Sequence, residues 1–183
     1  MWAMLRPSST LFASLTLAAA VGAALLTSPS TARADTTLGF ALGGVALERD
    51  GATSLHPTLH AQLTLELLGP LEVGGFVAGV GEELPLSHVS LAGGLVLLLR
   101  AQRPVLGLVP HLEASVARLQ LPSEAQGRVD GWSTAVGVGV GVPLDDGLRL
   151  EVRFTHSWFH GLPEAADVGD TAWTGTAGLS VDL

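Results

Sequence analysis

The sequence predicts an all-β fold, namely an eight-stranded antiparallel up-and-down transmembrane β-barrel that follows a cleaved signal peptide. Three observations predict it. The chain begins with an export signal, the remainder alternates apolar and polar residues with a period of two, and short turns alternate with long polar stretches between the expected strands. With 183 residues, the chain has room for one domain once the signal is removed.

The first 34 residues have the organisation of a secretory signal peptide. Arg6 supplies the basic start, an apolar run covers 11–26, and Ala32-Arg33-Ala34 provides the small-x-small cleavage pattern before Asp35. The apolar run is at the short end of the roughly 20 residues that cross a bilayer as a helix. We therefore expect residues 1–34 to be a signal peptide and residues 35–183 to form the barrel domain.

Composition excludes several kinds of site and partner. The chain has no cysteine, so it has no disulfide and no thiolate metal site. All nine basic residues are arginine, and removal of the signal leaves seven of them against 17 acidic residues, a net charge of −10. A chain of this charge, with no basic cluster in its sequence, is a poor partner for nucleic acid.

Alternation defines the strands. It is clearest in 59–67, where five apolar side chains share one face, and in 148–154, where four do. The predicted strands are 11 to 14 residues long, which exceeds the roughly 5 to 6 of soluble sheets and suits the roughly 9 to 11 that a tilted strand needs to cross a bilayer. The same test along the chain gives eight strands, near 37–47, 57–68, 71–81, 89–100, 105–118, 131–143, 147–160 and 171–183.

The connections between these strands fall into two classes. Short turns are expected after strands two, four and six, at 69–70, 101–104 and 145–147. Longer polar stretches follow strands one, three, five and seven, at 48–56, 82–88, 119–130 and 161–170. This arrangement is typical of bacterial outer-membrane barrels, in which the short turns are periplasmic. Both ends of the mature chain then lie in the periplasm.

The faces of the strands must decide between a membrane barrel and a soluble barrel that binds a small apolar ligand, which stays an alternative. Small residues on strands four and six leave room inside for charged side chains; they are Ala92, Gly94, Gly137, Gly139 and Gly141. Buried charges must be paired, and eight strands enclose just enough space for side chains to fill. We therefore expect a lumen plugged by salt bridges. The predicted network is Glu66, Glu72, Arg100, His111, Glu113, Arg149, Glu151 and Arg153.

The three tryptophans of the mature chain favour the membrane barrel. Trp132, Trp158 and Trp173 share the parity of the apolar residues on their strands and lie at the long-loop end of the predicted topology. Tryptophan is enriched where lipid meets water, so we predict that these three residues form an interfacial aromatic belt. Phe40 is the one obvious candidate for the periplasmic rim.

Over essentially its whole mature length, the chain resembles the small outer-membrane β-barrel proteins, the OmpA-transmembrane and OmpX-like group. The resemblance is one of architecture. It implies a location in the cell outer membrane, contact with outer-membrane lipid and lipopolysaccharide, insertion by the barrel-assembly machinery, and a monomer. In that family the last strand usually ends on an aromatic residue. Here WTGTAGLSVDL keeps the alternation through Leu179, Val181 and Leu183 but ends on leucine.

Some small barrels of this kind modify lipid A, and strand seven carries His156, Ser157 and His160. Adjacent strand residues point to opposite faces, so His156 cannot readily face Ser157. The His and Ser two residues apart on one face that the deacylase family has are missing from this strand. We therefore expect no catalytic site and no cofactor. The leading hypothesis is a structural or interaction protein. The soluble barrel that binds a small apolar ligand is the second hypothesis, and a lipid A-modifying enzyme is the third.

Histidines gather near the predicted long loops. His56 and His60 are expected at or near the first loop, His88 at the second and His160 at the fourth. None of them has carboxylates at a tight ligand spacing, which zinc sites usually need. We interpret them as scattered surface histidines and expect no metal site.

Overall fold

The computed structural model describes residues 36–49, 52–81, 89–123, 127–162 and 169–183. The predicted signal peptide, the predicted loop at 82–88 with His88, and the middle of the predicted loop at 161–170 lie outside the described residues. All described residues belong to one compact unit, Ala34–Leu183. Among them, no helix has the length and apolar character needed to cross a membrane.

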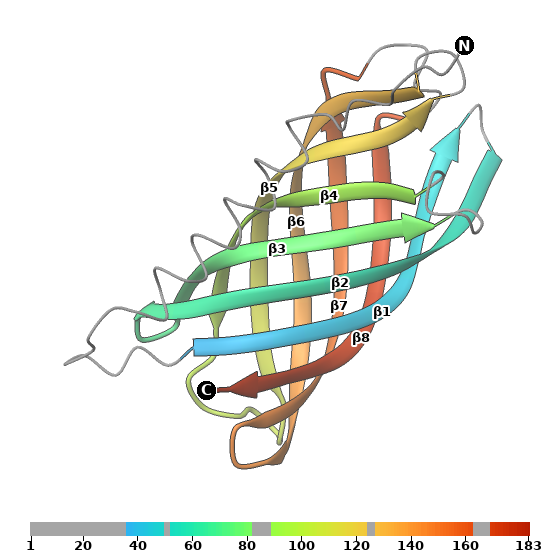
Figure 1. Cartoon of the computed structure of the whole chain (residues 1–183). Helices are drawn as coiled ribbons and strands as arrows, with labels where there is room; N and C mark the ends of the chain where they lie inside the picture. Colours follow the sequence, from blue (N-terminus) through green and yellow to red (C-terminus); the bar gives the residue numbers. More distant parts are fainter. Residues whose placement is uncertain (1–35, 50–51, 82–88, 124–126, 163–168) are drawn as a thin grey trace, which may run out of the picture. The chain divides into compact units, whose positions relative to one another are not determined.

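Eight antiparallel strands form a closed barrel in chain order (Figure 1). Each strand pairs with the next, and β1 pairs with β8 to close the ring, which brings the C-terminus beside the start of β1. The predicted fold class, strand number and order are confirmed. The strands are β1 Thr36–Arg49, β2 Ala52–Leu68, β3 Leu71–Gly81, β4 Val89–Arg100, β5 Val109–Ser123, β6 Gly127–Asp145, β7 Leu148–His160 and β8 Thr171–Asp182.

The start of the fifth strand differs from the prediction. Residues 105–108, predicted as the start of a strand, form a turn in which Leu106 and Gly107 have positive φ angles of 55° and 80°. A single bridge joins Val105 to Leu108 across this turn. β5 therefore begins at Val109, and the short turn predicted at 101–104 extends to residue 108.

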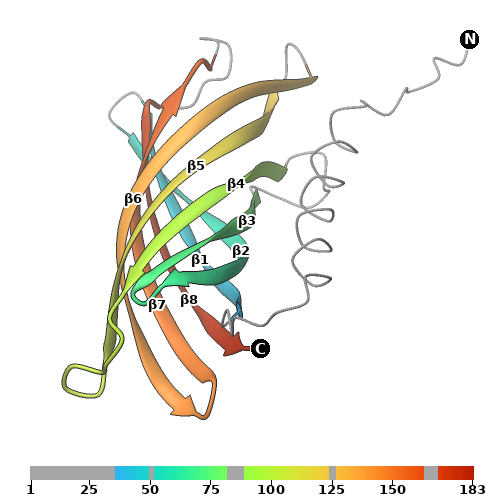
Figure 2. The same ribbon diagram turned by 90° about the vertical axis from the view of Figure 1, so that its left-hand side faces the viewer.

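Two predicted long loops are shorter than expected. The stretch 119–130 is mostly strand, because β5 continues to Ser123 and β6 begins at Gly127. The stretch 48–56 is reduced in the same way, since β1 ends at Arg49 and β2 begins at Ala52. Figure 2 shows that the β5–β6 pair extends beyond the ends of β3 and β4 at the long-loop end. These stretches contain residues that favour turns, so the sequence predicts loops there, although buried and less buried side chains continue to alternate along the described part of the first stretch.

The outside of the barrel is apolar. Burial alternates along the strands, as in the pattern of β6, and the apolar side chains are on the exposed face. A ring of exposed apolar residues is what contact with lipid requires, whereas a soluble barrel needs the reverse arrangement. The predicted direction of the faces is therefore confirmed. The exposed residues include Phe40, Leu42, Leu59, Val77, Leu95, Leu97, Leu112, Val136, Val138, Val152, Phe154 and Leu179.

Four glycines let neighbouring strands approach closely. A Cβ atom at Gly43, Gly74, Gly94 or Gly178 would lie 1.9 Å from a backbone oxygen of the adjacent strand. At Gly93, the outward neighbour of Gly94, the nearest atom to an added Cβ would be 3.7 Å away. The inward positions therefore require glycine because of their backbone surroundings.

Candidate functional site

The candidate site is a group of charged side chains inside the barrel, at the short-turn end. Arg149, Glu151 and Arg153 are two residues apart along β7, so all three point to the inner face. β7 starts directly after the turn at Gly147, where φ is 76°. The row therefore lies close to the short-turn end of the lumen.

Glu151 is the centre of this group. Arg100 Nη1 donates to its Oε1 at 2.8 Å, and Ser180 Oγ donates to the same oxygen at 2.9 Å. Arg153 donates to Oε2 through Nη2 at 2.5 Å and through Nε at 3.1 Å. Glu151 is 2% exposed. A buried carboxylate is tolerated because two guanidinium groups and a hydroxyl satisfy it.

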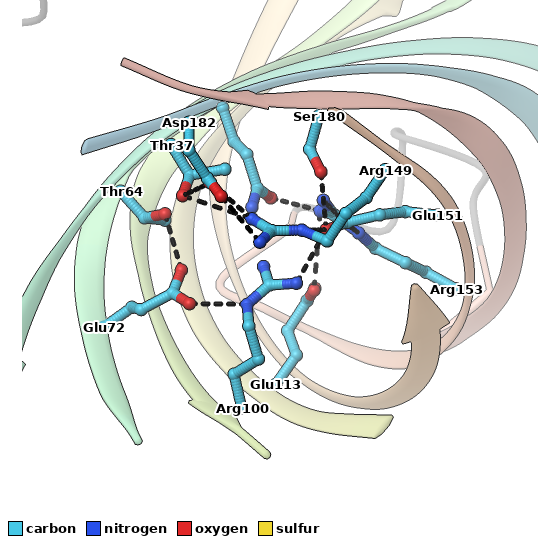
Figure 3. Close-up of polar contacts among 11 residues, drawn as sticks. Thr37, Thr64, Glu72, Arg100, Glu113, Arg149, Glu151, Arg153, Ser180 and Asp182 are labelled. Atoms are coloured by element: carbon cyan, nitrogen blue, oxygen red, sulfur yellow. Dashed lines mark hydrogen bonds and ion pairs between the residues drawn. The ribbon is translucent and has the colours of Figure 1, made fainter. Parts of the chain in front are cut away.

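Arg100 extends the network towards β3. Its Nε atom donates to Glu72 Oε1 at 2.5 Å, and Thr64 Oγ1 donates to Glu72 Oε2 at 2.8 Å. Arg100, Glu72 and Thr64 are all buried. One arginine therefore bridges two carboxylates that come from strands on different sides of the barrel (Figure 3).

Arg153 extends the network towards β2 and β5. Its Nη1 atom donates to Gln62 Oε1 and lies 3.8 Å from Glu113 Oε2. Together with the contacts of Arg100, this gives a continuous run of polar contacts between β2, β3, β4, β7 and β8. The run crosses the lumen (Figure 3).

A second polar group lies where β1 and β8 meet. Arg149 donates to both oxygens of Asp182, through Nη1 at 2.8 Å and Nη2 at 2.6 Å. Thr37 Oγ1 donates to Asp182 Oδ1 at 2.8 Å, and Arg149 Nε lies 3.9 Å from Glu151 Oε1. Asp182 therefore connects three strands at the closing seam of the barrel and joins them to the charged row (Figure 3).

The structure brings together six of the eight residues in the predicted network: Glu72, Arg100, Glu113, Arg149, Glu151 and Arg153. Glu66 is half-buried and faces Glu72 in the register, and within the described part of the chain it makes no ion pair. His111 is buried opposite Arg100, and its ring nitrogens have no hydrogen-bond partner among the described residues.

The glycines of β6 make room for the larger side chains, as predicted. A Cβ atom at Gly139 would lie 2.3 Å from His111 Nε2. At Gly141 an added Cβ would make only an ordinary contact with Arg149 Cδ, at 3.5 Å, so the requirement for glycine is at Gly139. Gly139 on β6 therefore permits the long side chain that crosses from β5.

Sequence reasoning missed five uncharged or terminal members of the network. All five share the inward parity of their strands, so parity was the signal that could have found them. They were left out because four are neutral and the fifth lies at the end of the chain. They are Thr37, Gln62, Thr64, Ser180 and Asp182. These residues and the ion-paired ones, with His111, are named here the charged half of the lumen.

The inner surface towards the long loops has a different character. Leu121 and Val129 are buried there and pack with Leu162. His60, expected at or near the first loop, is inside the barrel instead, with its ring 5.2 Å from that of Phe76. The predicted strand 57–68 already contained His60, so the strand was right and only the interpretation of His60 as a surface histidine was wrong. The neutral half of the lumen is Val45, Thr58, His60, Phe76, Ala117, Leu119, Leu121, Val129, Ser133, Ala135 and Ala172.

The three predicted belt residues are on the outer face. Trp132, Trp158 and Trp173 are all exposed, and Trp173 stacks on Phe154 with the ring centroids 5.1 Å apart. His156 lies between two of them, with its ring 4.4 Å from Trp158 and 4.1 Å from Trp173. His156 therefore points outward, while Ser157 has inward parity and pairs with Ala172 in the register.

Comparison with known proteins identifies the fold. No family model and no curated protein sequence matches the chain. Neisserial surface protein A matches its structure with a TM-score of 0.64 at 10% identity, over 81% of this chain and 97% of that one. The N-terminal β-barrel domain of Pseudomonas aeruginosa OprF matches with a TM-score of 0.58 at 13% identity, over 80% and 97%. These likenesses show that the chain has the fold of the small outer-membrane β-barrels, as the sequence predicts.

Proposed function

We propose that this protein is a non-enzymatic, monomeric outer-membrane protein of structural or interaction type, with a lumen closed by its charged half. The observation that carries the proposal is the bridging of Arg100 and Arg153 by Glu151 inside the barrel. Its signal peptide directs export, and its long loops face the outside of the cell. Outer-membrane lipid and lipopolysaccharide surround it.

A plug, and not an ion path, follows from the size of the barrel and the pairing of its charges. Eight strands enclose an interior that side chains can fill. The arginines of the charged half are bound to carboxylates from several strands. Opening a path would separate buried ion pairs, and loss of one partner of such a pair costs about 3 to 5 kcal/mol.

The outward position of His156 supports a role without catalysis. A serine nucleophile needs its base within hydrogen-bond reach. His156 contacts Trp158 and Trp173 on the outer face, whereas Ser157 has inward parity. This pair is therefore unsuited to attack on a lipid ester.

We propose that the barrel-assembly machinery inserts the protein, with β8 as the strand that closes the barrel. Leu183 N donates to Thr36 O at 2.8 Å, and Asp182 N donates to Gly147 O at 2.7 Å. The last two residues are therefore held by β1 on one side and by the β6–β7 turn on the other. Leu183 completes the closing seam without an aromatic ring.

Planar-bilayer recording tests the plug. We expect wild-type protein to give no large single-channel steps, and Glu72→Ala/Glu151→Ala to give small ones because two bridging carboxylates are removed. Glu66→Ala, which removes a charge without an ion pair among the described residues, is the matched control. Large steps from the wild type would refute the plug. Heat modifiability on denaturing gels, measured on each variant, establishes that the barrel is folded.

A further inference from the structure

Two arginines point outward at the long-loop end of the β5–β6 pair. Arg118 and Arg128 share the parity of the exposed residues there, whereas Arg100, Arg149 and Arg153 point into the lumen. Arg128 makes no ion pair within the described part of the chain. These two cations stand out on a mature chain that carries a net charge of −10.

Arg118 is available for another partner. Its Nη2 atom lies 3.1 Å from Asp130 Oδ2, and the two side chains are 38% and 53% exposed. Exposed ion pairs of this kind stabilise a protein by about 0 to 1 kcal/mol. A phosphate can therefore replace the Asp130 carboxylate at little cost.

The residues around Arg118 on the outer face change from apolar to polar in the direction in which a lipid leaflet changes from acyl chains to headgroups. Arg118 faces Trp132 in the register, and Trp132 faces His160 on β7. His160 Nε2 is 2.9 Å from Thr134 Oγ1, which adds a polar pair at this level. Further along the strands the outer face is apolar, with the exposed residues Val116, Val136 and Val138. Apolar residues thus cover the outer face nearer the middle of the barrel, Trp132 and Arg118 lie at one level beyond them, and Arg128 lies nearer the long loops.

We propose that Arg118, Arg128 and Trp132 bind the phosphorylated headgroup of an outer-leaflet glycolipid of the lipid A class. The guanidinium groups take the phosphate, for which their planar donors are matched. Trp132 lies at the level of the headgroup, and the acyl chains run along the apolar part of β5 and β6. The inference rests on the proposed function, because it needs the long-loop end to face the outer leaflet.

The test uses the full mature barrel in zwitterionic detergent micelles, titrated with diphosphoryl lipid A and followed by native mass spectrometry. We expect Arg118→Gln and Arg128→Gln each to weaken binding about fivefold, the effect of one basic side chain near an anionic membrane surface. Asp130→Asn should bind more tightly because the competing carboxylate is gone. Arg103→Gln, in the exposed turn after β4 at the other end of the barrel, should bind like the wild type. Lipid A without its phosphates should bind weakly to every variant.

Other results would overturn the proposal. Equal binding by wild type, Arg118→Gln and Arg128→Gln would show that lipid A does not use these residues. An equal loss in Arg103→Gln would show a general charge effect. If a soluble sulfated oligosaccharide binds in an arginine-dependent way and lipid A does not, the partner is a glycan. Heat modifiability separates the two proposals, because a folded, heat-modifiable barrel with arginine-independent binding refutes this inference alone.

Discussion

The two halves of the lumen fill the same kind of space with different chemistry. In the charged half, Glu151 joins Arg100 and Arg153, so each side chain depends on partners from other strands. In the neutral half, Leu121 and Val129 pack with Leu162. Apolar packing accepts many partners of suitable size, whereas a buried charge accepts few. We therefore expect the charged half to depend more strongly than the neutral half on how the strands are aligned.

The largest effect should come from breaking the centre of the charged half. Glu151→Ala leaves Arg100 and Arg153 without their shared carboxylate, and we predict a loss of about 3 to 5 kcal/mol in the free energy of unfolding. Urea unfolding of the barrel in lipid vesicles measures it. Glu66→Ala is the control and should change stability by less than about 1 kcal/mol. An equal loss in the two variants would remove the distinction between bridging and unbridged carboxylates.

The neutral half should respond to lost volume instead of lost charge. Leu121→Ala opens a gap beside Val129 and Leu162, and we predict a loss of about 2 to 3 kcal/mol, at the low end for buried leucines because the site is near the mouth. The same unfolding experiment measures it. Leu112→Ala, on the lipid-facing surface, should cost less because lipid fills the space. A larger loss at Leu112 would mean that the neutral half is poorly packed.

The period-two alternation in the sequence is sufficient to locate the strands, but it does not predict the register between neighbouring strands. Alternation located all eight strands, because every second side chain faces lipid and must be apolar. It failed at residues 105–108, since the positive φ of Leu106 leaves no mark in the apolar pattern. Which inward residues meet depends on the stagger between strands, which a period of two does not contain. Glu66 was therefore placed in the network by parity, although the register gives the bridging position to Glu72.

A smaller effect should distinguish two adjacent glycines of β4. Gly94→Ala places a Cβ atom 1.9 Å from Val116 O, and we predict a loss of about 1 to 2 kcal/mol because the strands must separate. Gly93→Ala should be close to neutral, since its nearest contact would be 3.7 Å. Unfolding midpoints of the two variants provide the measurement. Equal midpoints would show that the close approach of β4 and β5 is easily relaxed.

The smallest effect should come from the outward ion pair. Asp130→Asn removes the partner of Arg118 at the surface, and we predict a change of less than about 1 kcal/mol in the free energy of unfolding. The contrast with Glu151→Ala compares an exposed carboxylate with a buried one on the same barrel. A loss as large as that of Glu151→Ala would show that the outer pair holds the β5–β6 hairpin.

A double-mutant cycle between Arg100 and Glu151 tests most directly that the charged half acts as one connected network. The free energies of unfolding of wild type, Arg100→Ala, Glu151→Ala and the double variant are measured in the same vesicles. Each single change leaves a buried charge without its partner. We therefore predict that the double variant loses less free energy of unfolding than the sum of the two single losses, by at least about 1 kcal/mol. Additivity within about 0.5 kcal/mol would contradict the account, since it would mean that the two side chains contribute independently.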